Sequence, residues 1–445
     1  MDVKNQNFLV LGVSKSGYAA AEYLLTHGGN CKIIEENKTE KTEQAALKLI
    51  ELGAQKISAD QIDDELNGMD VLILSPGVPI NHPIAVKAKQ KGVRIMGELE
   101  FGYSQFFPKI VAVTGTNGKT TTVNLIDAIL KEGQIKSQMV GNVGVPLTEK
   151  VDSEKDTVFV TEVSSFQLES VSAFCPHVSC ILNISPDHLE RHYSMENYVF
   201  LKKRIFKNQR ESEYSILNFD DNTVREFYPE IKAKVKWVSL KEEVDGAYLK
   251  DGKLYYSGEY VMDESALKLK GEHNVCDALF AIAVAKILGV ENQYISAALS
   301  TFKGVKHRLE YVANKNGVDF YNDSKATNTA STISALSVMT APTVLILGGS
   351  EKGEKYGELF EKIKSSAVKH AILTGAARYN LLDAAAKKGF GEVTVTGSFD
   401  SAVKIAALLA CEGDSVLLSP ACASFDSFSG YAERGERFIK IVEEL

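Results

Sequence analysis

Short runs of hydrophobic residues alternate with amphipathic stretches along the whole chain. The runs Phe8–Gly12, Ile110–Val113 and Thr343–Gly349 have the length of strands, and glycine or a small polar residue ends or follows each of them. Behind the first run, the apolar positions of Ala19–Leu25 are typical of a helix. Strands that alternate with helices in this way predict an α/β fold with parallel sheets.

Three strand–turn–helix starts lie far apart in the sequence, at Phe8, Ile110 and Thr343, and each implies its own sheet. The chain of 445 residues is long enough for three domains, since one domain takes about 150 residues. We therefore expect three domains on mostly parallel sheets, in residues 1–98, 99–303 and 304–445. The first and third are expected to be Rossmann-like. Further strands are expected at 32–35, 70–74, 157–161, 178–184, 371–375, 392–397 and 415–421.

Composition and charge exclude several classes of protein. Hydrophobic residues make up 44% and charged residues 24% of the chain, which is ordinary for globular proteins and excludes a disordered or fibrous chain. The net charge is −8 and no long basic run is present, so we expect no nucleic-acid partner. No apolar stretch approaches a membrane span, and no signal peptide is expected. The six cysteines are scattered without a C-x-x-C pair, as in reduced cytoplasmic proteins.

The first glycine turn, Gly12–Gly17, lies between an expected strand and an expected helix. This is the context of a dinucleotide-binding fingerprint, but Ser14 stands where the middle glycine of that fingerprint would be. Glu35 and Glu36, at the end of the next strand, could hold a ribose or another hydroxyl group. The turn is compatible with a nucleotide-type ligand, with a nicotinamide cofactor or with a merely tight strand–helix connection. The missing glycine counts against the nicotinamide cofactor.

The second glycine turn is more specific, and it reads Thr114-Gly-Thr-Asn-Gly-Lys-Thr-Thr-Thr122. A glycine-rich loop after a strand turns its N–H groups toward a phosphate, Lys119 supplies a point charge, and the Thr120 hydroxyl suits Mg²⁺. Gly115 stands only three residues before Gly118, so the loop is shorter than in motor proteins or GTPases. The motif predicts that residues 99–303 form a P-loop ATPase domain that binds ATP or a close relative.

Two further strands end in candidate metal ligands. Glu162 follows the strand at 157–161, and His188 follows the strand at 178–184. Ligands bind at the carboxyl ends of strands in α/β sheets, so both side chains are candidates for Mg²⁺. Imidazole is an unusual ligand for this hard cation. His188 is therefore either a metal ligand or a hydrogen-bonded loop histidine.

The motifs of the second domain resemble the central domain of the Mur ligases. They are Gly115–Thr120, Glu162 with Ser164–Gln167, and Asn183–His188. In the third domain, Ser419–Asp426 resembles a segment of the family member that adds D-glutamate. Arg434, Gly435 and Phe438 match the same family member. The resemblance covers the whole chain, with ordered motifs in all three domains.

The resemblance implies a ligase of peptidoglycan precursor synthesis. This family member joins D-glutamate to the L-alanine carboxyl of UDP-N-acetylmuramoyl-L-alanine, while ATP is converted to ADP and phosphate. The carboxylate is first phosphorylated to an acyl phosphate, which the amine then attacks. The first domain would hold the UDP portion, the second ATP and Mg²⁺, and the third the amino acid. A cytoplasmic monomer that contacts neither nucleic acid nor membrane is expected.

The resemblance also assigns catalytic roles to Lys119, His188 and Lys202. The residues it places on Mg²⁺ are Thr120, Glu162, His188 and Lys202, the last as a carbamate. An ammonium group beside two metal ions would be repelled, whereas a carbamate is an anion. Lys203 is a direct competitor for this role, and a solvated basic helix face is the other interpretation of the pair.

Three further sets of residues match the binding positions of the family. For ATP they are Gly115, Thr116, Asn117, Gly118, Lys119, Thr120, Thr121, Asn274, Asp277, His307, Arg308 and Asp323. For the UDP-linked substrate they are Lys15, Ser16, Glu36, Asn37, Ser75, Gly77, Asn142, Ser164 and Gln167. For the amino acid they are Thr327, Lys352, Ser424 and Tyr431. Two departures stand out: Asp277 replaces the usual asparagine, and Glu35–Asn37 offers no arginine for the uracil ring.

Other classes of protein share parts of this sequence pattern. A Mur ligase that adds a different amino acid, or folylpolyglutamate synthase, would share the phosphate loop. The segment Ser419–Asp426 favours the D-glutamate enzyme. An NAD(P)-dependent oxidoreductase would need the glycine that is missing from the first turn. A P-loop switch protein would need a switch region, and none is evident.

Overall fold

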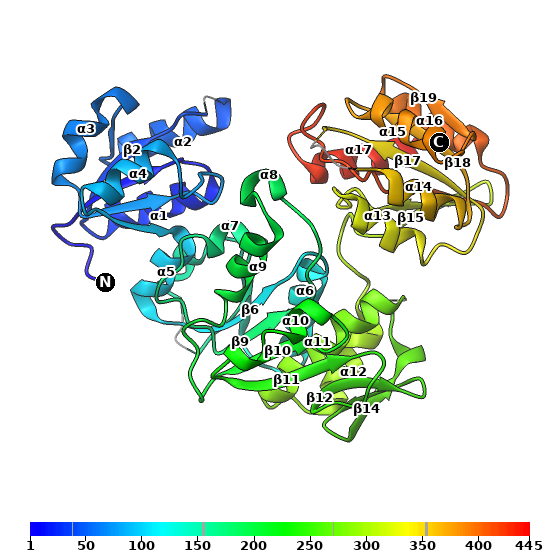
Figure 1. Cartoon of the computed structure of the whole chain (residues 1–445), viewed down its shortest axis with the longest axis horizontal. Helices are drawn as coiled ribbons and strands as arrows, with labels where there is room; N and C mark the ends of the chain where they lie inside the picture. The colour runs from blue at the N-terminus through cyan, green and yellow to red at the C-terminus, as the bar shows by residue number, and fades with distance from the viewer. Residues whose placement is uncertain (38, 154–155, 270, 352–354) are drawn as a thin grey trace. The chain divides into compact units, whose positions relative to one another are not determined.

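The computed structural model describes residues 1–37, 39–153, 156–269, 271–351 and 355–445. Three sheets with flanking helices follow one another along the chain (Figure 1). The predicted α/β fold with three mostly parallel sheets is therefore confirmed. The chain forms two compact units, Met1–Lys268 with Asn274–Phe302, and Leu269–His273 with Lys303–Leu445. The first two sheets lie in the first unit and the third sheet lies in the second.

The first sheet has five parallel strands in the order β3-β2-β1-β4-β5. Its strands are β1 (Asn7–Leu11), β2 (Asn30–Ile34), β3 (Gln55–Lys56), β4 (Val71–Leu74) and β5 (Arg94–Gly97). Its helices are α1 (Lys15–Thr26), α2 (Glu40–Glu51), α3 (Ile62–Glu65) and α4 (Pro83–Gln90), and α5 (Glu98–Phe106) leads into the second sheet. Because β1 lies between β2 and β4, the loops after these three strands meet at one edge.

The second sheet has nine strands in the order β14-β13-β12-β11-β10-β9-β6-β8-β7. They are β6 (Lys109–Thr114), β7 (Ser137–Gly141), β8 (Val158–Glu162), β9 (Val178–Ile181), β10 (Tyr214–Asn218), β11 (Lys234–Ser239), β12 (Gly246–Lys250), β13 (Lys253–Tyr256) and β14 (Glu259–Asp263). The helices are α6 (Lys119–Glu132), α7 (Ser165–Leu168), α8 (Leu189–His192), α9 (Met195–Lys203), α10 (Asn222–Arg225), α11 (Glu272–Ile287) and α12 (Asn292–Thr301).

Strand β6 shows why its four central residues, Ile110–Val113, are all hydrophobic. Val111 and Val113 point into the core formed with α6 and α11, whereas Ile110 and Ala112 point into the core on the opposite face. A strand buried on both faces cannot alternate between apolar and polar residues. Helix α11 is apolar around most of its circumference because it is buried against this sheet.

The third sheet has six strands in the order β15-β16-β20-β17-β18-β19. They are β15 (Glu310–Lys315), β16 (Val318–Asn322), β17 (Thr343–Gly348), β18 (Val368–Thr374), β19 (Val393–Val395) and β20 (Ser415–Leu418). The helices are α13 (Thr329–Leu336), α14 (Gly357–Lys364), α15 (Arg378–Lys387), α16 (Phe399–Leu409) and α17 (Tyr431–Glu443).

The expectation of parallel layers along the whole length is wrong at two sheet edges. Strand β13 is antiparallel to both β12 and β14, and β15 is antiparallel to β16. The turns at Asp251-Gly252 and Asn316-Gly317 have positive φ at both residues, 49° and 69° in the first and 53° and 80° in the second. Such pairs fit the twist of two-residue hairpins. Among the described helices, none is both long and apolar enough to cross a membrane.

Candidate functional site

The second glycine turn connects β6 to α6 at the carboxyl edge of the central sheet. Gly118, just before α6, has φ +87°, and a Cβ atom there would lie 2.4 Å from Oδ1 of Asp277. Only glycine fits this position without displacing the neighbour. Asn183 holds the loop from outside: its side-chain oxygen accepts from the Asn117 N–H at 2.8 Å, and its carbonyl accepts from the Thr116 N–H at 3.0 Å.

Two lysines converge on one carbonyl of this loop. Lys119 Nζ donates to Gly115 O at 2.8 Å and to Thr116 O at 2.7 Å, and Lys202 Nζ donates to Gly115 O at 2.8 Å and to Thr114 Oγ1 at 3.0 Å. Lys202 is only 1% exposed. Burial, assisted by the positive charge of Lys119, lowers its pKa well below the usual value. The structure therefore favours an uncharged amine at Lys202.

Thr120 and Glu162 form a pair of hard oxygen ligands. The register pairs Val113 of β6 with Glu162 of β8, which brings this carboxylate to the start of the phosphate loop. The Thr120 hydroxyl donates to Glu162 Oε2 at 2.6 Å, and Asn142 Nδ2 donates to Glu162 Oε1 at 2.7 Å. A hydroxyl and a carboxylate beside a phosphate loop suit Mg²⁺, which takes few protein ligands and completes its shell with phosphate and water oxygens.

His188 lies just before α8, beside Asp187 and Phe166. It has a left-handed φ of 53° just before α8, its Nε2 lies 3.5 Å from Asp187 Oδ2, and its ring packs on Phe166 at 4.9 Å. Within the described residues, no group of three or more His, Cys, Asp or Glu lies close enough to hold a metal ion. A role of His188 on Mg²⁺ stays a prediction.

Asn274 and Asp277 lie at the start of α11, as the sequence suggests. Asp277 is buried, and its Oδ1 accepts a hydrogen bond from the Thr122 hydroxyl at 3.1 Å. This carboxylate therefore binds the first turn of α6, which directly follows the phosphate loop. The adenine contact expected at Asp277 stays a prediction.

The residues expected at the UDP-linked substrate lie at the ends of β1, β2 and β4 and beside the phosphate loop. Lys15 donates to Gly144 O, and Ser75 is buried with its hydroxyl 3.1 Å from that of Ser14. Glu36 Oε2 lies 3.0 Å from His82 Nε2. The strand ends thus meet at one sheet edge, with Ser16 and Asn37 beside them.

Glu35, the other candidate for binding a hydroxyl group of the ligand, binds backbone N–H groups of the first domain. Its two carboxylate oxygens accept the N–H groups of Val13 and Asn37, each at 2.7 Å. Its role is therefore to hold the two adjacent turns. Ser164 and Gln167 likewise pair with each other in a capping box at the start of α7.

In the second unit, the residues expected at ATP form an internal network. His307 Nδ1 lies 2.9 Å from Asn322 Nδ2. Asp323 accepts from the Ser419 hydroxyl at 2.7 Å and from the Leu309 N–H at 3.2 Å. Burial raises the pKa of Asp323 to about 7, although Ser419 and then Arg308 oppose the shift. Asp323 therefore anchors its own loop, and its contact with a ribose stays a prediction.

The loops after β16, β17 and β20 meet around Arg434. Its guanidinium is buried and donates to carbonyl oxygens of Ser324, Gly348, Cys422 and Ala423. This arrangement brings together the loops that carry Thr327, Ser424 and Tyr431, all expected at the amino acid. Lys352, the fourth residue of that set, lies outside the described residues.

Some residues that shape the site were not singled out from the sequence. Asn183 belongs to a motif of the sequence, but its hydrogen bonds to the phosphate loop are not predicted from it. Nor does the sequence predict that Glu98, Glu169 and Arg191 connect separate segments. Asn183 carried a signal, because a side chain at the end of a strand next to the phosphate loop can reach it. The other three act through contacts with residues more than 20 positions away, which no local pattern encodes.

A phosphate loop, a threonine–carboxylate pair and three mostly parallel sheets define an ATP-binding α/β protein. Family models match the chain in three segments: "Mur ligase MurD-like, N-terminal domain" at residues 6–97, "Mur ligase middle domain" at 113–285, and "Mur ligase, glutamate ligase domain" at 307–422. Together these segments cover most of the sequence. The chain belongs to the Mur ligase family.

Two similar curated proteins are named UDP-N-acetylmuramoylalanine–D-glutamate ligase. The protein from Thermoanaerobacter sp. (strain X514) is 41% identical over 100% of both chains. The protein from Bacillus mycoides (strain KBAB4) is 41% identical over 100% of this chain and 99% of its own.

Solved structures share the fold at lower identity. UDP-N-acetylmuramate-alanine ligase MurC from Thermotoga maritima aligns with a TM-score of 0.64 and 18% identity, over 99% of this chain and 100% of that chain. MurF ligase from Thermotoga maritima, solved in complex with ADP, aligns with a TM-score of 0.61 and 17% identity, over 100% and 95%. These likenesses concern the fold alone.

Proposed function

We propose that this chain is an ATP-dependent ligase that joins D-glutamate to UDP-N-acetylmuramoyl-L-alanine in peptidoglycan precursor synthesis. The observation that carries the proposal is the identity of 41%, over the whole length, to proteins named for this activity. The phosphate loop and the adjoining Thr120–Glu162 pair supply the ATP and Mg²⁺ chemistry that such a ligase needs.

The proposed reaction turns an unreactive acid into an acylating agent. A carboxylate oxygen of the alanine end attacks the γ-phosphorus of ATP, the bond between that phosphorus and the ADP oxygen breaks, and an acyl phosphate forms. The amine of D-glutamate then attacks the acyl carbon, phosphate leaves with its bonding electrons, and the amine releases a proton. The products are an amide, ADP and phosphate.

The residues of the phosphate loop carry most of the charge stabilisation in this proposal. Lys119 exchanges the two carbonyl oxygens that it contacts for phosphate oxygens of ATP. Thr120 and Glu162, which are hydrogen-bonded to each other, would hold one Mg²⁺, and His188 would hold a second. Magnesium, when bound, neutralises phosphate charge and so makes the γ-phosphorus accessible to an anionic nucleophile.

We further propose that Lys202 is carbamylated. Burial lowers the pKa of its amine, which favours the uncharged form whose nitrogen lone pair attacks CO₂, forming a carbamate and releasing one proton. The competitor Lys203 forms an ion pair with Glu230 and lies 5.4 Å from the centre of the Phe227 ring. Lys203 is therefore engaged by Glu230 and Phe227, whereas Lys202 contacts the phosphate loop.

The remaining expectations complete the proposal. Residues 1–98 take the UDP portion, residues 99–303 take ATP, and residues 304–445 take D-glutamate, with the three residue sets given above. The enzyme works as a cytoplasmic monomer. Neither nucleic acid nor a membrane takes part in the reaction.

The test measures phosphate release by the purified chain with ATP, Mg²⁺ and UDP-N-acetylmuramoyl-L-alanine. D-glutamate, L-glutamate, L-lysine and meso-diaminopimelate are added one at a time. We expect release with D-glutamate to exceed that with the other amino acids by at least about 100-fold. A site that binds both carboxylates of D-glutamate misplaces the amine of the L-enantiomer, and a longer or cationic side chain leaves its carboxylate-binding groups unpaired. Equal release with every amino acid, or without any, would overturn the proposal.

A further inference from the structure

Arg191, in the short helix α8, uses its whole guanidinium group to join two segments of the first unit. Nε and Nη2 donate to the two carboxylate oxygens of Glu169, at 2.9 and 2.7 Å. Nη1 donates to Gly77 O at 3.0 Å. Nη2 also donates to Val78 O at 3.2 Å and to Pro76 O at 3.4 Å. One side chain thus holds three consecutive carbonyls of the loop after β4.

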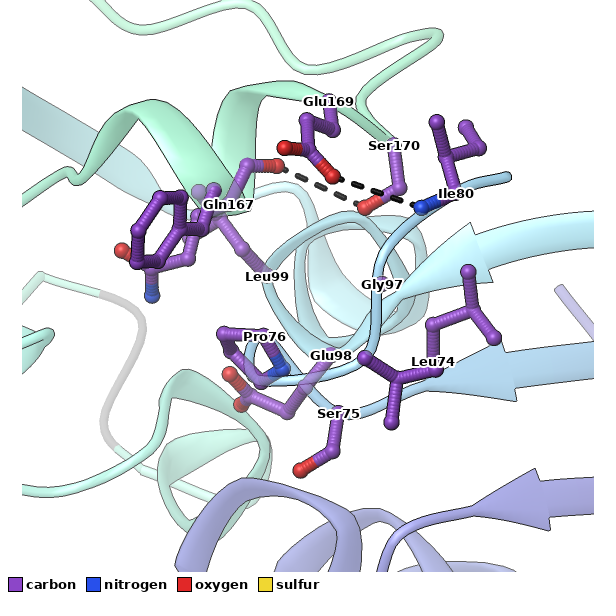
Figure 2. A pocket seen from close by; sticks show the side chains of 12 residues that line it. Leu74, Ser75, Pro76, Ile80, Gly97, Glu98, Leu99, Gln167, Glu169 and Ser170 are labelled. Carbon is purple, nitrogen blue, oxygen red and sulfur yellow. Dashed lines mark hydrogen bonds between the residues drawn. The ribbon is translucent and has the colours of Figure 1, made fainter. Parts of the chain in front are cut away.

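The pair is well enclosed. The side chains of Arg191 and Glu169 are 15% and 8% exposed, and the guanidinium carbon lies 4.7 Å from the centre of the Phe166 ring. Glu169 Oε2 also accepts the N–H of Ile80 at 3.4 Å, a bond drawn in Figure 2. A two-point arginine–carboxylate contact fixes both partners in direction, which a lysine cannot do. Arg191 therefore holds loop 75–80 at the carbonyls of residues 76–78, and Glu169 holds it at Ile80.

The anchored loop carries two residues of the proposed substrate site. Ser75 and Gly77 lie in it, and His188, a proposed metal ligand, stands three positions before Arg191 in the sequence. Figure 2 shows loop 75–80 facing residues 166–170 across a small cavity. That cavity, of about 10 Å³, has room for one water molecule, so little space is left for the loop to shift.

We propose that Arg191, held by Glu169, is a positioning residue that fixes loop 75–80 for the UDP-linked substrate. The inference rests on the proposed function. Glu169 neutralises and orients the guanidinium, and the guanidinium holds the loop carbonyls in place before substrate arrives. A loop that is already ordered costs less conformational entropy on binding. In the hydrogen bonds above Arg191 makes no contact with the phosphate loop, so we expect its loss to change the KM for ATP only slightly.

The test compares full-length Arg191→Met with the wild type and with the control Arg204→Met. Arg204 also donates to the segment after α7, at Glu169 O and Val171 O, but not to loop 75–80. We expect Arg191→Met to raise KM for UDP-N-acetylmuramoyl-L-alanine at least about tenfold, with KM for ATP and for D-glutamate within about twofold of wild type. Arg204→Met should leave all three KM values within about twofold.

A second measurement does not depend on catalytic activity. Hydrogen exchange of the amides in residues 75–80 should be at least about tenfold faster in Arg191→Met, and also in the milder variant Glu169→Gln, because both lose the anchor. Exchange should stay unchanged in Arg204→Met. If the exchange of this loop does not change, or if all three KM values rise together, the inference is wrong. A wild-type chain that is inactive with the UDP-linked substrate and D-glutamate would contradict the proposed function instead.

Discussion

Replacing Glu98 by glutamine should make the chain clearly more stable at alkaline pH and change its stability only slightly in mild acid. Glu98 is the first residue of α5 and is only 1% exposed. Its Oε1 accepts the N–H and the hydroxyl of Thr148, both at 2.8 Å. Within the described part of the chain, its Oε2 has no hydrogen-bond partner. Figure 2 shows the side chain beside Ser75 and Pro76.

The magnitude follows from the pKa of this carboxyl group. Burial raises the pKa of Glu98 from 4.5 to about 7, although the hydrogen bonds from Thr148 oppose the shift. The folded chain therefore keeps a proton that the unfolded chain releases between these pH values. The stabilisation is complete below pH 4.5 and is lost as the pH rises through 7. At pH 8 the loss amounts to about 3 kcal/mol, since one pKa unit is worth about 1.4 kcal/mol.

The assay is urea denaturation at pH 5 and pH 8, followed by the fluorescence of Trp237, the single tryptophan of the chain. Glutamine keeps an oxygen for Thr148 and carries no charge, so Glu98→Gln should match the wild type within about 1 kcal/mol at pH 5. At pH 8 it should be more stable by about 2–3 kcal/mol. An equal difference at both pH values would refute the reasoning.

The nearby Glu100 provides a matched control. It is equally buried, but its two oxygens accept the N–H groups of Ser172, Ala173 and Phe174 at 2.7–3.0 Å. Glutamine there would turn an amide N–H toward a backbone N–H. Glu100→Gln should therefore destabilise the chain at both pH values, by about 2 kcal/mol.

Three further substitutions test the phosphate loop. Lys119→Ala should abolish phosphate release while calorimetry shows UDP-substrate affinity within about threefold of wild type, and loss of that affinity too would mean that the loop is structural. Lys202→Ala should lower kcat at least about 100-fold and regain activity with short carboxylic acids, which replace the carbamate charge. Gly118→Ala should weaken ATP binding at least about tenfold, because its Cβ would meet Asp277. Gly68→Ala, where a Cβ meets nothing within 4 Å, should bind ATP normally.

The strands of the three sheet interiors could be predicted because burial on both faces requires continuous apolar runs. Strand β6 is the clearest case, since its run of valines and alanine ends directly at the phosphate loop. The antiparallel edges were missed, although Asp251-Gly252 and Asn316-Gly317 are recognised hairpin turns. The short helix α8 was also missed, because four residues carry no periodicity.

The candidate site was predictable where it depends on strand ends and not where it depends on side-chain partners. The contact of Thr120 with Glu162 follows from the parallel register of β6 and β8. The partner of Glu35 does not follow from any pattern, since its carboxylate turns to backbone N–H groups instead of solvent. The position of Arg191 on loop 75–80 depends on folding of distant segments, which local sequence does not encode.

The central claim is that ATP serves to phosphorylate the carboxylate of the UDP-linked substrate. Its most direct test labels both oxygens of that carboxylate with ¹⁸O and analyses the released phosphate by mass spectrometry. One labelled oxygen should appear in each phosphate, because the acyl–oxygen bond breaks when the amine of D-glutamate attacks. Unlabelled phosphate, released while the amide forms, would contradict the account.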